Sequence, residues 1–408
     1  MAEFPRLEDI NVTNKIVLVR TDLNVPMQGG KVTDNTRIVR LLPTLNYLLK
    51  KKAKIVLMSH FDRPGGKFVP SMSLAPLVDP LSQALGGREV KFGVDCVGPA
   101  AHEAVNKLKS GDVLLLENLR FHAEEEKGGA PFARELASLG DVFVNDAFSC
   151  SHRAHASITG IAAHLPAVAG RLMEEEVSQL SALFDAPKKP IAAMVGGSKI
   201  STKLDLLNNL TKKMDKLLIG GAMANTFLHA QGYSVGKSHC EKDMKATALK
   251  ILRNAEKNGC EIILPTDLIV VTQFKAHADC MVVNVGDIPE GGMATDIGPA
   301  SAYLFSEVLE ACKTVVWNGP VGAFETCPFD NSTVTLARMI AKLTAQKKIR
   351  SVAGGGDTVA ALSHAGVVKQ FSYISTAGGA FLEWLEGKKL PGVMVLMKTV
   401  KTKSRAAR

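Results

Sequence analysis

The chain has 408 residues, of which 46% are hydrophobic and only 5% aromatic, and it carries a formal net charge of +9. At roughly 100–200 residues per domain, this length predicts two domains. The sequence has neither a run of about eighteen apolar residues nor a basic, apolar leader, so we expect no membrane span and no secretion signal. Its seven cysteines form no CxxC pair, which predicts reduced thiols and a cytoplasmic location.

The positive charge suggests a polyanionic partner, either a nucleic acid or a phosphorylated small molecule. Its distribution favours the small molecule, because the basic residues stand singly and aromatic stacking residues do not alternate with them. The basic segment at residues 398–408 has almost no apolar residues, so we expect a solvated end. We therefore expect neither a nucleic acid nor a membrane as the partner.

Short aliphatic runs alternate with amphipathic stretches along the whole chain. Strands are expected at residues 15–20, 54–59, 113–117, 142–145, 191–195, 216–219, 261–264, 314–317, 349–353 and 371–375. Helical patterns lie between them at residues 37–51, 131–139, 203–212 and 300–312. This alternation predicts an α/β fold with parallel sheets covered by helices on both faces. A long amphipathic helix at 170–184, followed by a helix-breaking proline, is where we expect the domain boundary.

In the first half, charged and amide side chains follow the expected strands. Arginine presents a planar fork that binds carboxylate or phosphate, and the carboxyl ends of parallel strands share one edge of a sheet. A single arginine could equally well tie a loop to a neighbouring carboxylate, but several at successive strand ends favour an anion site. The residues concerned are Asp22, Asn24, His60, Arg63, Arg120 and Arg153.

In the second half, glycines follow the expected strands. Glycine lets the backbone approach a phosphate closely, and a helix N-terminus offers free N–H groups and positive potential. One such loop could simply close a turn, but five favour a nucleotide platform. Lys199 and Lys203 would face the same phosphates, and Asp357 is suited to holding Mg²⁺ on a nucleotide. The loops are at residues 196–197, 220–221, 319–322, 354–356 and 378–379.

The segment at residues 232–238 resembles a P-loop but fails in two respects. Gln231 stands where the pattern needs its first glycine, and the segment follows a helical pattern instead of a strand. We therefore do not expect it to bind phosphate. A dinucleotide-dependent dehydrogenase is also disfavoured, because no GxGxxG follows a strand together with an acidic residue at the next strand end.

The motifs at the strand ends resemble those of the phosphoglycerate kinase family in order and spacing over about residues 5–397. The chain looks like a bacterial member of that family. The runs that carry the resemblance are residues 22–24, 59–64, 117–122, 145–155, 196–203, 317–322, 354–358 and 375–379. The resemblance implies a glycolytic enzyme that is a monomer with two doubly wound, Rossmann-like domains facing a cleft. It implies a phosphoglycerate-binding domain at 1–170, with 390–408 packing back on it, and a nucleotide-binding domain at 171–389.

The resemblance also implies roles for individual residues. Phosphoglycerate would be bound by Asp22, Leu23, Asn24, Arg37, His60, Arg63, Arg120 and Arg153. The nucleotide would be bound by Lys199, Lys203, Gly221, Asn318, Glu325, Gly355, Gly356, Asp357 and Thr358, with Asp357 as the ligand of Mg²⁺.

The implied reaction moves a phosphoryl group from 1,3-bisphosphoglycerate to ADP, giving 3-phosphoglycerate and ATP, and it is reversible. The carboxylate of the acidic substrate is already ionised near neutral pH, so no general base is required. Catalysis would consist of positioning and charge neutralisation. Arg37 and Lys199 are expected to supply the positive charge. Gly378 and Gly379 are expected to supply backbone N–H donors. Hinge motion is expected around 170–184 and near the C-terminal return.

Some positions depart from the family pattern. They are Phe61-Asp62, Ser149-Cys150-Ser151, Ala222 and Ala377. Asp62 places a negative charge beside Arg63, and a Cβ at Ala377 could crowd the transferring phosphoryl group. The alternative reading is therefore a catalytically impaired member of the family that still binds nucleotide.

Overall fold

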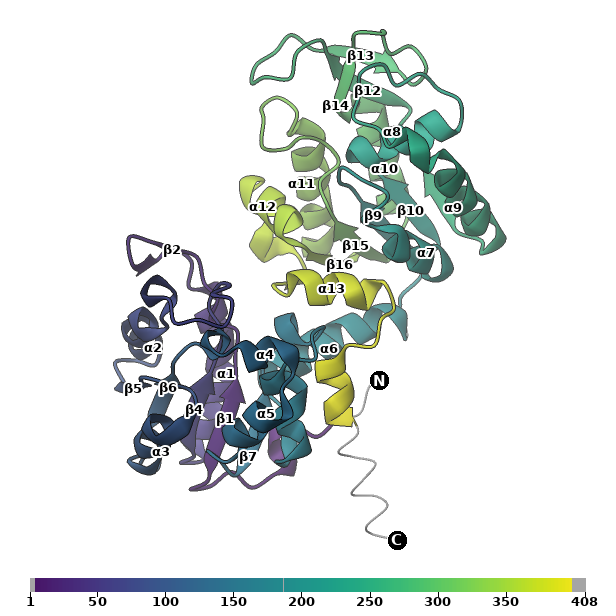
Figure 1. Cartoon of the computed structure of the whole chain (residues 1–408). Coiled ribbons are helices and arrows are strands. Elements are labelled where there is room, and N and C mark those ends of the chain that lie inside the picture. The colour runs from purple at the N-terminus through teal and green to yellow at the C-terminus, as the bar shows by residue number, and fades with distance from the viewer. Residues whose placement is uncertain (1–3, 186, 398–408) are drawn as a thin grey trace. The chain divides into compact units, whose positions relative to one another are not determined.

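The computed structural model describes residues 4–185 and 187–397, which form two compact units (Figure 1). One unit comprises the described residues up to Ser181 together with residues 389–397, and the other comprises Ala182–Lys388. The division falls within helix α6 (Arg171–Phe184), the long helix expected at 170–184. The expected basic end at residues 398–408 lies outside the described residues. Among the described residues, no helix is both long and apolar enough to span a bilayer.

The first unit is built on a six-stranded parallel sheet with strand order β5-β6-β4-β1-β7-β8. Its strands are β1 (Ile16–Arg20), β4 (Lys54–Met58), β5 (Val90–Gly93), β6 (Val113–Leu116), β7 (Val142–Asn145) and β8 (Ala167–Ala169). A two-stranded ribbon of β2 (Met27–Gln28) and β3 (Lys31–Val32) precedes the first helix. The helices are α1 (Thr36–Lys50), α2 (Val78–Ala84), α3 (Gly98–Asn106), α4 (Ala123–Lys127) and α5 (Ala130–Ala137), followed by α6.

Both faces of the central strand β1 are buried. Val17 and Val19 belong to one hydrophobic cluster with Leu41 and Leu45 of α1. Leu18 points to the other face and is equally inaccessible to solvent. Continuous burial explains why these strands read as unbroken aliphatic runs in the sequence.

The second unit contains a six-stranded parallel sheet with strand order β11-β10-β9-β15-β16-β17. Its strands are β9 (Ile191–Val195), β10 (Lys216–Ile219), β11 (Glu261–Ile263), β15 (Thr314–Asn318), β16 (Arg350–Gly354) and β17 (Tyr373–Ser375). The helices are α7 (Leu204–Lys213), α8 (Gly221–Ala230), α9 (Lys245–Lys257), α10 (Pro299–Glu310), α11 (Asn331–Ala345), α12 (Gly356–His364) and α13 (Gly378–Leu385). The largest fully buried side chain, Trp317 on β15, packs with Phe305 of α10 and Leu336 of α11 in one cluster.

A second, antiparallel sheet of three strands belongs to this unit and was not expected from the sequence. Its order is β13-β12-β14, with β12 (Asp267–Val271), β13 (Met281–Asn284) and β14 (Met293–Ile297). Figure 1 shows it beyond helix α8 from the parallel sheet. It provides an apolar wall, described below, that a plain doubly wound domain lacks.

In both parallel sheets the chain reverses its winding direction beside the first strand. Strand β1 has β4 on one side and β7 on the other, and β9 has β10 on one side and β15 on the other. Crevices that bind ligands form at the carboxyl ends of strands at such switch points. The predicted α/β fold with two doubly wound parallel sheets is confirmed.

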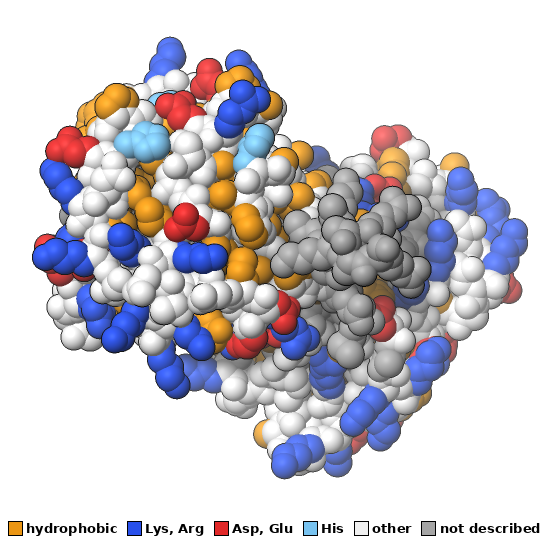
Figure 2. All heavy atoms as spheres, turned by 90° about the horizontal axis from the view of Figure 1, so that it is seen from below, with side chains coloured by type: hydrophobic (Ala, Val, Ile, Leu, Met, Phe, Trp, Pro, Cys, Tyr) orange, Lys and Arg blue, Asp and Glu red, His pale blue; other side chains and the backbone are white. Residues whose placement is uncertain are grey.

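Basic side chains are dispersed over the face drawn in Figure 2, with acidic side chains between them. The described residues visible on this face form no continuous basic stripe of the kind that tracks a nucleic-acid backbone.

Candidate active site

The carboxylate of Asp22 anchors the site at the end of β1. Its Oδ2 atom lies 2.5 Å from Nη1 of Arg37, at the start of α1, and also accepts a hydrogen bond from the Ser149 hydroxyl. Its Oδ1 atom accepts a hydrogen bond from the Asn24 backbone N–H at 3.1 Å. Burial opposes ionisation, but the Arg37 guanidinium and these hydrogen bonds together hold the pKa of Asp22 below its usual value.

Behind Asp22 lies a buried charged cluster centred on Arg20, which is 1% exposed. Its Nη2 atom is 3.3 Å from Nδ1 of His60, and its Nε donates to the Ser157 hydroxyl at 2.7 Å. The balancing charge is Glu125 of α4, also fully buried, which lies 4.0 Å from Arg20 and 3.7 Å from Nδ1 of His155. A buried charge needs such a partner.

Two histidines report the electrostatic character of this region. Burial, and then the cations Arg20, Arg120 and Arg153, lower the pKa of His155 to about 4. Burial also holds the pKa of His60 well below its usual value. Both rings are therefore neutral near pH 7, and the cations around them make the crevice attractive to anions.

The loop after β4 is tied to the loop after β1 through Asp62. Its backbone N–H donates to Oδ1 of Asn24 at 3.0 Å, and its carbonyl accepts a hydrogen bond from Nη1 of Arg120 at 2.6 Å. Asp62 has a φ of 51°, in the left-handed region that favours glycine. The next residue, Arg63, has an exposed side chain.

The structure thus gathers most of the predicted phosphoglycerate-site residues at one edge of the first sheet. Leu23 differs, because its side chain is fully buried in the hydrophobic core and only its backbone could face a ligand. The predicted set omitted Arg20, Glu125 and Ser149. Arg20 was visible as the last residue of a strand, whereas no sequence signal marked Glu125 as buried.

In the second unit, the loops after β9 and β15 press against each other. A Cβ on Gly196 would overlap the carbonyl oxygen of Pro320, so only glycine allows this approach. Gly221, at a φ of 65°, donates its N–H to the Val321 carbonyl at 2.7 Å. These glycines therefore do more than close turns, because they bring two strand ends into contact.

Lys203 lies between these loops. Its Nζ atom donates to the Gly196 carbonyl at 2.7 Å and to Oδ1 of Asn318 at 2.8 Å. Burial lowers its pKa to about 8, against the opposing effect of the Asp357 carboxylate. An ammonium held by neutral carbonyl and amide oxygens keeps its positive charge available to a nearby anion.

The same network fixes the loop after β16. Asn318 donates from Nδ2 to the Gly354 carbonyl at 2.8 Å, and the Thr358 hydroxyl accepts a hydrogen bond from the Gly319 N–H at 2.7 Å. Gly355 has a φ of 102°, and a Cβ there would lie 2.8 Å from Nδ2 of Asn318. Helix α12 begins at the next residue, so its free N–H groups and the exposed Asp357 carboxylate stand at this strand end.

Beside this network lies a hollow of about 390 Å³, large enough for a base and its sugar. Three predicted residues line it, namely Gly221, Glu325 and Asp357. Its apolar walls come mainly from the unexpected three-stranded sheet and the segments around it, through Leu268, Phe274, Met293 and Ile297. These apolar residues were not predicted from the sequence.

The remaining predicted residues are accessible. Lys199 has an exposed side chain. Helix α13 begins at Gly378, followed by the exposed Gly379, so N–H groups of its first turn have no partner within the helix. Ala377, just before it, has a φ of −96°, so its Cβ causes no backbone strain.

Comparison with known proteins agrees with this geometry. Residues 7–388 match the family described as phosphoglycerate kinase. The chain belongs to this family. The phosphoglycerate kinase of Granulibacter bethesdensis is 56% identical over 393 residues, covering 96% of this chain and 99% of the relative. That of Xanthobacter flavus is 54% identical over 399 residues, covering 98% and 100%. The structure of phosphoglycerate kinase from Coxiella burnetii superimposes with a TM-score of 0.89 at 40% identity, covering 97% and 99%.

Membership of the phosphoglycerate kinase family confirms the predicted class of enzyme, a phosphotransferase with a carboxyl group as acceptor. Members of this family use a nucleotide with Mg²⁺, and the residues present fit that ion. Asp357 offers an exposed carboxylate on the wall of the hollow, and Mg²⁺ prefers oxygen ligands of this kind together with nucleotide phosphates.

The P-loop-like segment at residues 232–238 follows a helix and not a strand, as the sequence predicted. It follows the end of helix α8, and the Lys237 N–H donates to the Gly292 carbonyl at 2.8 Å. That N–H is therefore used within the fold and not presented to a phosphate.

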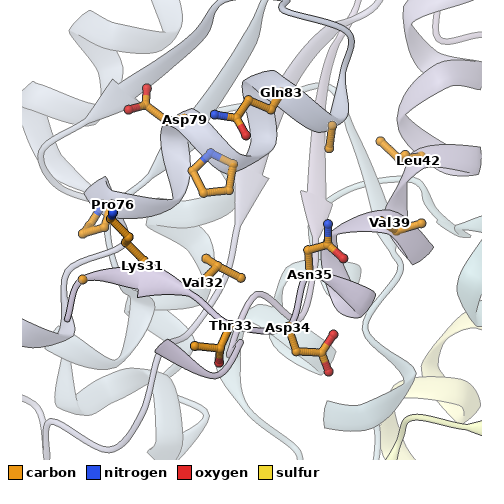
Figure 3. Close-up of a pocket in the computed structure, with 13 residues that line it drawn as sticks. Lys31, Val32, Thr33, Asp34, Asn35, Val39, Leu42, Pro76, Asp79 and Gln83 are labelled. Carbon is orange, nitrogen blue, oxygen red and sulfur yellow. The ribbon is translucent and has the colours of Figure 1, made fainter. Parts of the chain in front are cut away.

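A larger hollow of about 1000 Å³ lies elsewhere in the first unit (Figure 3). Figure 3 shows Asp79 and Gln83 on one side of it and Thr33, Asp34 and Asn35 on the other. None of its 13 lining residues is buried, and none belongs to the predicted site. We interpret it as a surface depression.

Asp95, Cys96 and His122 also lie close together, with donor atoms within 4.8 Å of one another. Nε2 of His122 is 2.7 Å from Oδ1 of Asp95, which explains the pairing as an ion pair or hydrogen bond. Burial, with the nearby carboxylates, raises the pKa of Cys96 well above its usual value. The thiol is therefore protonated, which disfavours metal binding.

Proposed function

We propose that this protein catalyses the reversible transfer of the acyl phosphoryl group of 1,3-bisphosphoglycerate to ADP, giving 3-phosphoglycerate and ATP, in the cytoplasm. The main support is the cluster of cations at the strand ends of the first unit, with two neutral histidines held among arginines. Such a cluster suits a small, multiply charged anion.

On the phosphoglycerate side, Asp22 and Asn24 are proposed to bind the substrate hydroxyl. Its phosphate would be held by the arginines and the histidine at the strand ends. These residues are His60, Arg63, Arg120 and Arg153. Arg37, half-buried and already oriented by Asp22, is proposed to reach the transferring phosphoryl group.

On the nucleotide side, the base is proposed to occupy the apolar hollow and Glu325 to bind the ribose. Lys199, Lys203 and the first turn of α12 would hold the phosphates. Three strand-end loops would position them, through Gly221 after β10, Asn318 at the end of β15, and Gly355, Gly356 and Thr358 after β16. Asp357 would hold Mg²⁺, which when bound neutralises negative charge on the nucleotide phosphates.

In the proposed step, a terminal oxygen of ADP attacks the acyl phosphorus while the bond from phosphorus to the carboxyl oxygen breaks. The electron pair stays on the carboxylate, which is a stable ion at neutral pH, so no proton has to move. Arg37 and Lys199 would neutralise the three equatorial oxygens, assisted by N–H groups of Gly378 and Gly379. The protein's contribution is therefore charge and alignment.

We further propose that the protein is a monomer whose two units close during the reaction. If the two substrates bind to different units, they must meet in line and away from water. Small-angle scattering should then give a smaller radius of gyration with both ligands bound than with none. An unchanged radius would contradict closure.

The deciding experiment measures ATP formation from ADP and 1,3-bisphosphoglycerate with Mg²⁺. The test variants are Arg37→Ala and Lys199→Ala, and the exposed residues Arg88 and Lys342 provide matched Arg→Ala and Lys→Ala controls. We expect kcat to fall about a hundredfold or more in each test variant and to stay unchanged in the controls. A wild-type protein that binds ATP without turnover would instead identify an impaired family member.

A further inference from the structure

Ser149 occupies a position beside the Asp22–Arg37 ion pair that the family resemblance does not explain. It lies in a short 3-10 helix, Phe148–Cys150, directly after β7. Strands β1 and β7 are hydrogen-bonded neighbours in register, with Arg20 opposite Asn145. The end of β7 is therefore carried next to Asp22, and the Ser149 hydroxyl donates to Oδ2 of that carboxylate.

Two donors share this single oxygen. Nη1 of Arg37 lies 2.5 Å from the same Oδ2 atom, whereas Oδ1 is occupied by the Asn24 N–H at 3.1 Å. The Asp22 side chain is 10% exposed and that of Arg37 is 32% exposed. The carboxylate is therefore the buried partner that needs donors, and the guanidinium is the accessible partner that can move.

The reaction places a demand on this pair. While Nη1 of Arg37 is directed at Asp22, that carboxylate balances part of the guanidinium charge, so Arg37 neutralises the phosphoryl group only in part. Without Ser149, an Arg37 that turned away would leave Oδ2, a largely buried charged oxygen, with no protein donor and only the substrate hydroxyl as a partner, which is costly. Ser149 is the neutral donor that remains on that oxygen.

We propose that Ser149 is a positioning residue that keeps Asp22 hydrogen-bonded while Arg37 turns from Asp22 to the transferring phosphoryl group. This inference rests on the proposed function. Ser149 forms no covalent bond in this role and accepts no phosphoryl group. It lowers the cost of releasing Arg37, and its effect on the rate therefore passes through Arg37.

Acting through Arg37 distinguishes this role from simple support of the loop. If Ser149 only supported the loop, its replacement would lower kcat equally with or without Arg37. If Ser149 eases the release of Arg37, its replacement should have little effect on kcat once Arg37 is absent. A double-mutant cycle between Ser149 and Arg37 separates the two cases.

The experiment measures kcat and KM for 3-phosphoglycerate and ATP in the wild type, Ser149→Ala, Arg37→Ala and the double variant. We expect Ser149→Ala to lower kcat about tenfold, the usual effect of losing a hydrogen bond to a charged group. KM should change less than about threefold for either substrate, because the lost interaction acts mainly in the transition state. In the Arg37→Ala background the same serine change should alter kcat by less than about twofold.

Two further variants make the test independent of folding defects. Ser149→Thr keeps the hydroxyl and should recover most of the activity lost in Ser149→Ala. Ser151→Ala, two residues away, removes a hydroxyl that donates to the Ala147 carbonyl and not to Asp22, and should leave kcat unchanged. Thermal unfolding of each variant shows whether the fold is retained.

The outcomes separate the two proposals. An inactive wild type would overturn the proposed function and this inference with it. An active wild type with an equally active Ser149→Ala variant would overturn the role of Ser149 alone. An equal loss with and without Arg37, or no recovery in a folded Ser149→Thr variant, would also overturn it.

Discussion

Nucleotide binding at pH 8 should be accompanied by proton uptake at Lys203. Its ammonium donates hydrogen bonds to the Gly196 carbonyl and to Oδ1 of Asn318, and burial lowers its pKa from 10.5 to about 8. Nucleotide phosphates placed beside it would favour the charged form and raise this pKa again. Lys203 would then take up a proton whenever the nucleotide binds.

The size of the effect follows from the shift. The fall in pKa from 10.5 to about 8, at about 1.4 kcal/mol per pKa unit, means that burying the charged form costs about 3–4 kcal/mol. The pKa of Lys203 is lower in the folded protein than in the unfolded chain, so the unfolded chain binds the proton first as the pH falls. The free energy of unfolding is therefore highest above pH 10.5 and decreases until the pH has fallen through about 8. At pH 8 about half of the side chains are neutral, and at pH 7 about a tenth. The expected uptake is therefore about half a proton per nucleotide at pH 8 and about a tenth at pH 7.

Isothermal titration calorimetry measures this uptake directly. ADP with Mg²⁺ is titrated at each pH in several buffers with different ionisation enthalpies, and the slope of the binding enthalpy gives the number of protons. The phosphates of ADP are largely ionised at pH 8 and contribute little. Lys203→Arg keeps a permanent charge and should show almost no uptake, whereas Lys212→Arg, an exposed change on α7, should behave like the wild type. Absence of uptake in the wild type, or an unchanged slope in Lys203→Arg, would refute the reasoning.

Three further changes test other parts of the structure. Glu125→Gln removes the buried carboxylate that balances Arg20, and should lower the free energy of unfolding in urea by about 3 kcal/mol. Asp62→Gly relieves a left-handed φ of 51° and removes a negative charge near the site, and should raise that free energy by up to about 1 kcal/mol while lowering KM for 3-phosphoglycerate. Gly196→Ala places a Cβ against the Pro320 carbonyl, and should destabilise the protein by about 2 kcal/mol and weaken ADP binding.

Matched changes define the controls. Glu103→Gln breaks an exposed ion pair with Lys107 and should leave the free energy of unfolding almost unchanged. Gly291→Ala adds a Cβ with nothing within 4 Å and should leave the free energy of unfolding nearly unchanged.

If Glu125→Gln lowers the free energy of unfolding no more than Glu103→Gln does, the buried cluster is not needed for stability. If Gly196→Ala binds ADP normally, the contact between the two loops is not needed for the nucleotide site. An unchanged KM in Asp62→Gly would remove the proposed charge effect.

The parallel sheets could largely be predicted from the sequence because their inner strands are buried on both faces. Strands such as β4 and β9 are unbroken aliphatic runs, and the predicted ranges agree closely with their bounds. Strands β5 and β8 were missed. The four residues of β5 include Lys91, and β8 has three residues, two of them alanines. At the edge of a sheet, strands pair on one side only and need less hydrophobic sequence.

The three-stranded sheet was missed for a related reason. Met281 and Val282 of β13 are largely exposed, so no alternation between buried and exposed residues marks that strand. Strand β14 of the same sheet contains polar residues such as Asp296, whose two oxygens accept the Ile297 and Ser332 N–H groups. Strand β12 is an aliphatic run, but nothing in the sequence indicated its antiparallel pairing. The apolar wall of the 390 Å³ hollow therefore became visible only in the structure.

The sequence by itself determined the class of fold, the family and most candidate residues of both sites, because the carboxyl ends of parallel strands collect functional side chains at one edge. Tertiary structure alone decided how those residues are paired. Asp22 and Ser149 are 127 positions apart, and only the pairing of β1 with β7 brings them together. Local sequence shows which donors and acceptors a chain carries, but long-range strand order decides which of them bind the same oxygen.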